Sequence, residues 1–235
     1  MRDRRTRKEI SNGGGHAVHD RVRAERGRVR RPERTRNRIL EAATDEFSAR
    51  GLGGARVDSI ARAAGVNKRM LYHYFGNKED LFLAVLERAY EKIRGKESAL
   101  RLENLPPVEA MRRLVRFTFN YFVENQYFVA LLNSENLHRA RHIRLSPRVT
   151  SINSPVIGIL ERVLKRGRRA GVFRGGVDAV QLYISIAGVA YFYFSNIHTL
   201  STIFARDLNS RAALAERERH VTDVILGYLR PGGGR

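Results

Sequence analysis

The chain contains no cysteine. It therefore has no disulfide framework, no cysteine-type zinc site and no thiol nucleophile, an absence that fits a reducing cytoplasm. No apolar run reaches the roughly 18 residues that a membrane-spanning helix needs, and the first thirty residues lack the apolar core of a signal peptide. We expect a cytoplasmic protein with no membrane partner.

Acidic residues are scarce as well. Against 24 Asp and Glu stand 44 Lys and Arg, which gives a formal net charge of +20 over 235 residues. This imbalance favours a polyanionic partner such as nucleic acid or an acidic membrane surface. With 43% hydrophobic residues the chain can still bury a substantial core, so we expect one or two folded domains.

The N-terminal segment, residues 1–31, carries eleven Lys or Arg against four acids and contains no aromatic residue. Too little apolar surface is available there to offset the chain entropy that folding costs. The composition predicts a flexible basic arm, and an inert tail is the alternative.

Beyond this arm, apolar residues recur at helical spacing, with little strand-like alternation and no hairpin signal. The sequence predicts an all-α protein of about nine helices. Asn67 and Asn77 are good N-caps, and glycines mark several helix ends. The expected helices cover about residues 32–50, 57–65, 67–76, 77–95, 108–122, 126–140, 149–170, 178–204 and 210–229.

The short turn "AGVN" joins the second and third expected helices and contains glycine, which is the sequence form of a helix-turn-helix. The second helix of such a motif enters the major groove of DNA by its N-terminal residues, here Asn67, Lys68 and Arg69. Leu71 and Phe75, four residues apart, fall on the opposite, packing face. The alternative is a small amphipathic helix with a solvated basic edge.

The stretch "GLGGARVDSIARAAGVNKRMLYHYFGNKEDLFLAVL", with "RILEAATDEFSARG" before it, resembles the DNA-binding region of TetR-family transcriptional regulators over about Arg34 to Leu86. The resemblance implies a homodimer whose heads, residues 32–78, bind a partly palindromic double-stranded operator. Residues 79–230 would then dimerise and hold a small-molecule effector.

Individual roles follow from the same resemblance, position by position. It implies base-reading or groove-facing roles for Lys68, Arg69 and His73. It implies contacts with DNA phosphates for Arg56, Tyr72, Tyr74 and Lys78. Two positions depart from the family pattern: Ala55 lacks the Thr or Ser oxygen that caps the second helix, worth about 0.5 to 2 kcal/mol, and Asp58 stands where a basic residue can occur.

Aromatic residues concentrate in the C-terminal half, where 13 of the 20 fall between Phe117 and Phe204. They predict either a large aromatic core or an apolar cavity, and the polar groups on the same helices favour a cavity because buried polar groups need partners. The predicted effector pocket comprises Phe117, Tyr121, Phe128, Asn133, Asn136, Tyr183, Tyr191 and Asn196. The stretch "IAGVAYFYFSNIHTLSTIFARDL" resembles the branch that includes regulators of pyrimidine utilisation and other nitrogen-heterocycle catabolism.

The last two expected helices correspond to the usual dimer interface of the family. Small residues permit close helix approach there: Ser185, Ala187, Gly188 and Ala190. An apolar stripe that would complete the interface comprises Leu214, Val221, Val224, Ile225 and Leu229. Use of this stripe inside the chain's own core is the alternative.

Other functions find less support. Glu135, His138 and His142 have the spacing of three metal ligands on one helix face, but the neighbouring arginines 139, 141 and 144 oppose a cation. No paired catalytic carboxylates or Ser-His-Asp pattern is visible, so we expect no enzyme, no metal and no cofactor. We expect a DNA-binding regulator, a repressor that an effector releases from its operator. The alternatives are a nonspecific nucleic-acid-binding protein and, further off, a helical enzyme.

Overall fold

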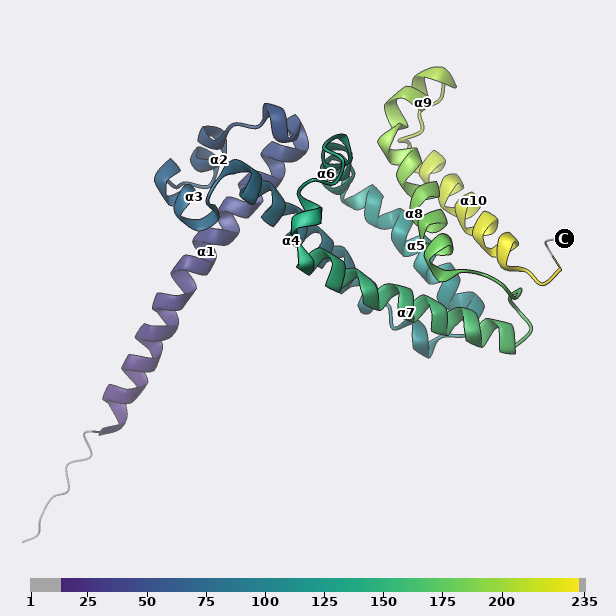
Figure 1. Cartoon of the computed structure of the whole chain (residues 1–235), viewed down its shortest axis with the longest axis horizontal. Helices are drawn as coiled ribbons and strands as arrows, with labels where there is room; N and C mark the ends of the chain where they lie inside the picture. Colours follow the sequence, from purple (N-terminus) through teal and green to yellow (C-terminus); the bar gives the residue numbers. More distant parts are fainter. Residues whose placement is uncertain (1–13, 233–235) are drawn as a thin grey trace, which may run out of the picture.

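The computed structural model describes the backbone of residues 14–232, and the side chains from residue 32 onward except those of residues 153 and 154. The described backbone is helical and contains no strand, which confirms the all-α prediction. Figure 1 shows α1 to α3 at one end of the molecule and the remaining helices in a larger bundle. The elements are α1 Gly14–Gly54, α2 Val57–Ala63, α3 Lys68–Phe75, α4 Lys78–Ser98, the 3-10 helix η1 Leu102–Asn104, α5 Pro107–Glu124, α6 Gln126–Leu137, the 3-10 helix η2 Ile143–Leu145, α7 Pro147–Arg169, α8 Ala179–Ser195, α9 Ile197–Ile203 and α10 Arg211–Leu229.

Helix α1 differs from the expectation at its beginning. The predicted flexible arm falls partly on residues 1–13, which lie outside the described residues, but from Gly14 the backbone is already helical and runs through Pro32. An interior proline removes an N–H donor and its ring crowds the preceding turn, at a cost of about 3 kcal/mol. Most residues between Gly15 and Pro32 are good helix formers, and the proline lies inside the helix instead of starting it. Gly51, with φ of 63°, interrupts the helical geometry close to the predicted end at Arg50.

The head consists of α1 to α3 with the beginning of α4. Ile39, Leu40 and Phe47 of α1 are at most 1% exposed and pack with the buried Ile60 of α2 and Leu71 of α3. The same hydrophobic cluster continues into α4, α6 and the ends of α5 and α8. The core therefore runs without a gap past residue 78, and the division of the chain at that point stays a prediction.

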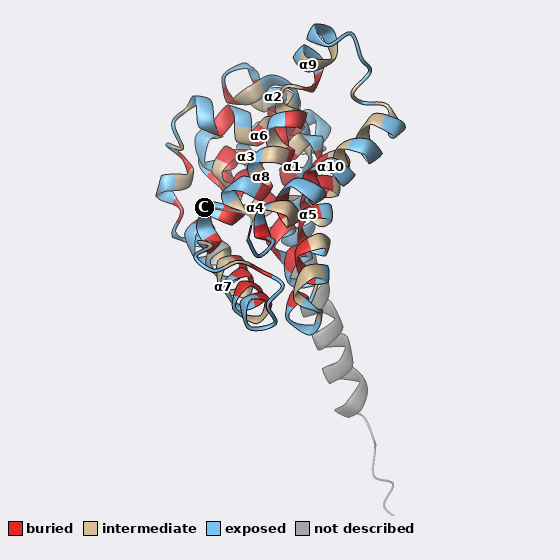
Figure 2. Ribbon diagram, turned by 90° about the vertical axis from the view of Figure 1, so that its right-hand side faces the viewer, coloured by how far each residue is buried: buried red, intermediate tan, exposed pale blue. Residues whose placement is uncertain are grey.

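The body consists of α4 to α10. Helix α5 packs against α8 and α10, and α7 packs against α4, so that a second hydrophobic cluster forms among α5, α7, α8 and α10. Figure 2 shows the buried residues gathered where these helices face one another. Within residues 14–232 no single helix is long and apolar enough to cross a bilayer; α8 and α9 pass that test only as a pair bent by 67°.

This bend also corrects a prediction. One helix was expected over residues 178–204, but the chain turns at Asn196, whose side-chain amide donates to the carbonyl of Phe192 at 2.9 Å and to Ser195 Oγ at 2.8 Å. Asparagine competes for backbone hydrogen bonds in this way and favours helix ends. The described chain accordingly has ten α-helices where about nine were expected.

One buried hydrogen bond joins the head to the body, and a second buried network lies inside the body. The backbone N–H of Leu52, just after the Gly51 interruption, donates to Ser134 Oγ of α6 at 3.2 Å. Farther along, Glu135 accepts from the backbone N–H groups of His142 and Ile143, both at 2.9 Å, and its second oxygen lies 2.6 Å from His142 Nδ1. Because α6 packs on α1, the bond between Leu52 and Ser134 lies within the contact of head and body.

Candidate DNA-binding surface and buried polar cavity

The helix-turn-helix geometry is built by local capping. Asn67 Oδ1 accepts from the backbone N–H of Met70 at 2.7 Å and so begins α3 as predicted. The turn before it needs Gly65, because its φ of 61° is unfavourable for residues with a side chain. Arg38 of α1 donates to the carbonyl of Gly65 at 3.1 Å, which ties the turn to α1.

Helix α3 has one buried and one exposed face. Leu71 is fully buried and Phe75 is 8% exposed, and both pack into the head core. The guanidinium of Arg36 lies over the Phe75 ring at 5.2 Å from its centre. The exposed side chains of this helix are Lys68, Arg69, Met70, Tyr72 and His73. The three predicted base readers thus lie on one solvent-facing surface.

Lys68 forms an ion pair across the turn. Its Nζ lies 3.1 Å and 3.3 Å from the two carboxylate oxygens of Asp58 on α2, and both side chains are at least half exposed. The hydrogen bond and the charge of Asp58 raise the pKa of Lys68. Asp58, which departs from the family pattern, therefore pairs with Lys68, one of the predicted base-reading residues.

The predicted phosphate-contacting residues flank this surface. Tyr72 is 41% exposed, whereas Tyr74 is half-buried beside His73, with ring centres 5.7 Å apart. Lys78 begins α4, and its Nζ lies 3.4 Å from the carbonyl of Gly53. Arg56 begins α2, and its side chain is exposed.

The N-cap position of α2 is Arg56 and not Ala55, one residue later than the sequence predicted. No side chain caps this helix from the N-cap position, which Arg56 occupies. Instead, the backbone N–H of Arg56 donates to Glu46 Oε1 of α1 at 3.0 Å. Helix α4, by contrast, is capped by Asn77, which accepts from the N–H groups of Glu79 and Asp80 at 2.8 and 2.9 Å.

The eight predicted effector-pocket residues do not surround one cavity. Tyr121 and Phe128 are buried and pack against each other with ring centres 5.8 Å apart, and Phe117 packs on Tyr121. These three belong to an aromatic core, the alternative that the sequence left open. Two aromatic helix faces in contact exclude a cavity between them because their rings fill it.

The polar members of that set are placed elsewhere. Asn133 and Asn136 are exposed on α6, and Tyr191 of α8 donates to Asn133. Asn196 forms the bend after α8. Only Tyr183 points to a buried polar group, on α4.

That group is a charged pair which the sequence analysis did not identify. Arg94 and Glu97, one turn apart on α4, are 8% and 4% exposed. Arg94 Nη1 lies 2.6 Å from Glu97 Oε2, and Nη2 donates to the Tyr183 hydroxyl at 2.5 Å. Burial raises the pKa of Glu97 to about 7, although Arg94 acts in the opposite direction, and burial raises the pKa of Tyr183 to about 12.

The signal for this pair was present in the sequence. Leu86, Tyr90, Arg94 and Glu97 follow one another at spacings of three and four, so the two charges fall on the apolar face of α4. Charged residues are almost never fully buried unless they are paired. Charges on an apolar helix face therefore mark a candidate site.

Arg94 and Glu97 form the polar end of a cavity of about 280 Å³ between α4, η1, α5 and α7. None of the eight predicted pocket residues lines it. Its apolar lining comprises Leu102, Leu114, Ile152, Pro155, Val156 and Ile159. A small molecule could thus be held by its apolar body and recognised at its polar end.

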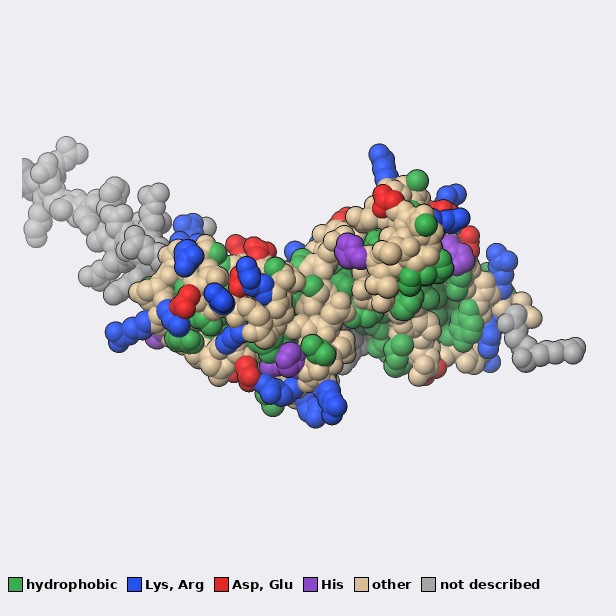
Figure 3. All heavy atoms as spheres, turned by 90° about the horizontal axis from the view of Figure 1, so that it is seen from above, with side chains coloured by type: hydrophobic (Ala, Val, Ile, Leu, Met, Phe, Trp, Pro, Cys, Tyr) green, Lys and Arg blue, Asp and Glu red, His purple; other side chains and the backbone are tan. Residues whose placement is uncertain are grey.

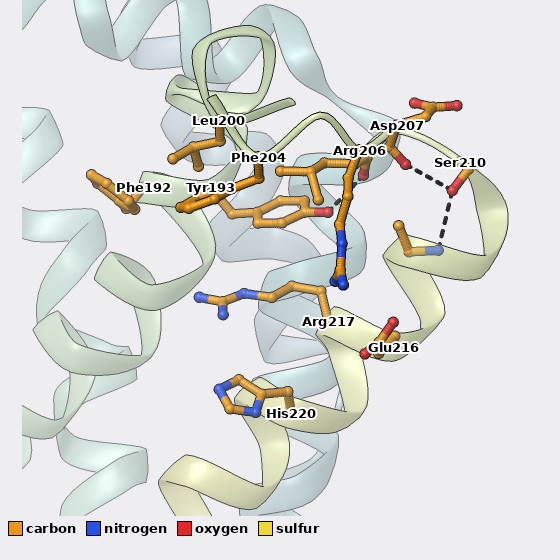
Figure 4. Close-up of a pocket in the computed structure, with 12 residues that line it drawn as sticks. Phe192, Tyr193, Leu200, Phe204, Arg206, Asp207, Ser210, Glu216, Arg217 and His220 are labelled. Atoms are coloured by element: carbon orange, nitrogen blue, oxygen red, sulfur yellow. Dashed lines mark hydrogen bonds between the residues drawn. The ribbon is translucent and has the colours of Figure 1, made fainter. Parts of the chain in front are cut away.

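A larger, open cavity of about 900 Å³ lies where α8, α9 and α10 meet (Figure 4). Phe192 and Phe204 contribute apolar surface, while Arg206, Arg217 and His220 contribute polar groups. In Figure 4 the Tyr193 ring lies across the floor, and its hydroxyl donates to the carbonyl of Leu208 at 2.6 Å. None of the predicted pocket residues lines this cavity either.

Helices α8 and α10 expose apolar side chains to solvent. Figure 3 shows apolar surface over this C-terminal half of the molecule. The exposed residues are Val180, Ile184 and Phe192 of α8 and Val224 and Tyr228 of α10, each between 45% and 58% exposed. A Cβ atom added to Gly188 or Gly227 would meet nothing within 4 Å, so another helix can approach α8 and α10 closely at these glycines.

The predicted dimer stripe is therefore wrong in most of its members. Val221, Ile225 and Leu229 are at most 3% exposed because they fill the chain's own core. Ala190 is buried as well. Among the stripe residues only Val224 faces solvent in the described structure, and the exposed apolar face lies one step around the helix from the predicted one.

The spacing of Glu135, His138 and His142 does not produce a metal site. Glu135 is occupied by His142 and Ile143, as described above, and His138 Nδ1 lies 2.7 Å from the carbonyl of Ser134. No group of three or more possible metal ligands occurs within the described residues.

A helix-turn-helix head on an all-helical body, with cations on the exposed face of the second helix, defines a class of DNA-binding regulators. Comparison with known proteins gives the family. The description "Bacterial regulatory proteins, tetR family" matches residues 39–85, and "Tetracyclin repressor-like, C-terminal domain" matches residues 107–225. The chain belongs to the TetR family of transcriptional regulators.

Individual relatives agree with this assignment. The HTH-type transcriptional repressor NicS of Pseudomonas putida is 39% identical over 203 residues, 86% of this chain and 96% of that protein. The HTH-type transcriptional repressor SCO4008 of Streptomyces coelicolor is 52% identical over 60 residues, 26% of this chain and 31% of that protein. The structure of the transcriptional regulator SCO4942 from Streptomyces coelicolor matches with a TM-score of 0.63 at 23% identity, over 83% of this chain and 98% of that chain, and supports the fold.

Proposed function

We propose that this TetR-family regulator is a repressor that binds a palindromic operator as a homodimer and is released from it by a small-molecule effector. The observation that carries the proposal is the exposed face of α3, where Lys68, Arg69 and His73 lie together while Leu71 and Phe75 anchor the helix. Relatives named as repressors support repression of transcription over activation. Because the family consists of transcriptional regulators, we propose no catalytic role.

In the proposed complex, the N-terminus of α3 enters the major groove. Arg69 and Lys68 donate to the O6 and N7 acceptors of guanine, and His73 faces the groove one turn later. Tyr72, Tyr74, Arg56 and Lys78 contact phosphates and set the register. The positive end of the α4 helix dipole adds to the phosphate site.

The proposed dimer uses the exposed face of α8 and α10. Two copies related by a twofold axis would bury Val180, Ile184 and Phe192 against the same surface of the partner. Gly188 and Gly227 permit the helices to approach closely. Half-sites one helical turn of DNA apart, about 34 to 36 Å, would then mirror the twofold symmetry of the protein.

Footprinting on the DNA upstream of the protein's own gene tests the operator. We expect one protected palindrome. Arg69→Ala should cost about 1 to 3 kcal/mol and relax the preference at one base position. Arg113→Ala, an exposed arginine on α5, is the matched control and should leave the footprint unchanged. Equal weakening on all sequences would place Arg69 on phosphate instead.

Sedimentation of the full chain tests the dimer. Ile184→Glu places a charge at the centre of the proposed interface and should give a monomer at concentrations where the wild-type chain is dimeric. Glu161→Gln, which changes an exposed carboxylate on α7, is the control. A dimeric Ile184→Glu variant would place the interface elsewhere.

A further inference from the structure

The open cavity where α8, α9 and α10 meet is formed by two features of the backbone. The bend at Asn196 turns α9 by 67° from α8, so that α9 stands away from α10 (Figure 1). Ala205 then ends α9 with φ of 48°, in a turn that glycine usually makes, and the N–H of Arg206 donates to the carbonyl of Ser201 at 3.0 Å. A left-handed alanine costs roughly 1 to 2 kcal/mol, and such strain concentrates at functional sites.

The apolar part of the cavity wall is exposed. Phe192 at the end of α8 is 58% exposed, and Phe204 just after α9 is 61% exposed. Leu200 of α9 lines the cavity with them (Figure 4). A volume of about 900 Å³ lies near the upper end of the range for ligand pockets, so this wall suits an extended apolar body.

The charged side chains of the cavity favour an anion. In Figure 4, Arg206 reaches from the loop before α10 toward the side on which Arg217 and His220 lie. Arg206 and His220 form no ion pair with any described residue. Of the two lining acids, Asp207 points away from the cavity in Figure 4, which leaves Glu216. Two guanidinium groups and an imidazole therefore stand against one carboxylate.

Arg217 has the greatest need of an acceptor among these side chains, because it is half-buried. Its guanidinium lies 5.4 Å from the centre of the Tyr193 ring, and its Nη2 donates to the carbonyl of Val189 at 3.2 Å. No carboxylate of a described residue pairs with it. Nε is buried without an acceptor, so a ligand contact falls to Nη1, which is neither buried nor hydrogen-bonded. A guanidinium stacked on a ring keeps its edge available for a carboxylate.

We propose that this cavity binds a carboxylate with an extended apolar body, such as an alkyl chain. The carboxylate accepts hydrogen bonds from Arg217 Nη1 and from Arg206, and His220 adds a third donor. The apolar body covers Phe192 and Phe204 and removes their surface from water. The inference goes beyond the proposed function, because it concerns a ligand site at one end of α8 and α10 and neither operator binding nor release.

Other ligand classes fit the cavity less well. A neutral apolar ligand would leave Arg217 without an acceptor for its free N–H groups. A cation would meet two guanidinium groups of its own sign. The carboxylate with an apolar body satisfies both the charged and the apolar part of the wall.

A second copy of the chain is the other candidate occupant. The proposed dimer face centres on Ile184, which lies eight residues before Phe192 and so about 12 Å away along α8. On α10 the dimer face uses Val224 and Tyr228 in the second half of the helix, whereas the cavity is lined by the first half. The proposed interface therefore reaches the rim of the cavity at Phe192 and does not fill it.

Calorimetry on the full-length chain with four probes tests the inference. Decanoate carries the chain and the carboxylate, decanol the chain alone, decyltrimethylammonium the chain with a cation, and butyrate the carboxylate with a short chain. We expect decanoate to bind at least about tenfold more tightly than each of the other three. No binding of decanoate, or equal binding of decanoate and decanol, would overturn the proposal.

Variants assign the contacts. Arg206→Gln and Arg217→Gln should each weaken decanoate binding about fivefold or more and leave decanol unaffected. Phe204→Glu, at an exposed position, places a like charge beside the carboxylate and should weaken decanoate binding as well. Arg219→Gln, an exposed arginine of α10 outside the cavity, is the matched control. Unchanged decanoate affinity in both Arg206→Gln and Phe204→Glu would contradict the assignment.

The Ile184→Glu variant distinguishes the ligand from the partner chain. Because one chain forms the whole cavity, the wild-type chain and this variant should bind decanoate with similar affinity. Binding by the variant but not by the wild-type chain would mean that the partner occupies the cavity, and the proposal would fail. Operator footprinting is unaffected by either result, so the proposed function is tested separately.

Discussion

Glu97 makes the stability of the protein depend on pH. The pKa of this carboxyl rises from its ordinary value of 4.5 to about 7 in the folded chain, because burial disfavours its charged form more than Arg94 favours it. Between these values the unfolded chain has released the proton while the folded chain retains it, so raising the pH favours unfolding. The difference corresponds to about 3 kcal/mol, at about 1.4 kcal/mol for each pH unit. Arg94 on the same helix, Tyr183 of α8 and Tyr121 of α5 are the titratable or charged neighbours.

Glu97→Gln removes this titration. We expect the free energy of unfolding of the wild-type chain to fall relative to the variant by about 3 kcal/mol from about pH 4.5 to above pH 7. Urea unfolding at several pH values measures it, at one fixed protein concentration because dimer stability depends on concentration. Glu161→Gln corrects for the loss of one exposed carboxylate. A difference between wild type and Glu97→Gln that stays constant across this range would refute the reasoning.

Three further changes probe the head. Leu71→Ala, at a fully buried position, should lower the free energy of unfolding by about 2 to 5 kcal/mol in urea titrations, and a loss below 1 kcal/mol would argue against α3 as an anchored helix. Asp58→Asn should release Lys68 from its exposed ion pair and tighten operator binding at fixed salt by about 0.2 to 1 kcal/mol, whereas an unchanged affinity would mean that Lys68 does not reach DNA. Ser134→Ala should cost about 1 to 3 kcal/mol because the buried N–H of Leu52 loses its acceptor; a neutral effect would show that this bond does not hold the head to the body.

The elements of the helix-turn-helix were predictable because local interactions determine them. Asn67 and Asn77 begin their helices by accepting from N–H groups two or three residues ahead, and Gly65 adopts a backbone conformation that disfavours other residues. Leu71 and Phe75 follow from helical periodicity alone. For such features a short stretch of sequence contains both partners of each interaction.

The interior of the body was not predictable in the same way. The contact of Arg94 with Tyr183 joins residues 89 positions apart, and the aromatic residues around Tyr121 fill space that their composition alone left open as a cavity. The bend at Asn196 and the helix before Pro32 depend on weak local preferences for and against helix. The sequence pattern does not show which of these preferences prevails. The hydrophobic core of the body determines which face of α10 packs inward. The exposed apolar face therefore lies one residue around the helix from the face that the sequence pattern predicted.

The central claim is that the exposed face of α3 recognises one DNA sequence. Fluorescence anisotropy of the full chain at physiological salt, with the protected upstream DNA and a scrambled duplex of equal length and composition, tests it most directly. We predict binding to the operator on the order of 10³-fold tighter or more than to the scrambled duplex. Equal affinities that decline together with added salt would contradict the claim and indicate a nonspecific nucleic-acid-binding protein.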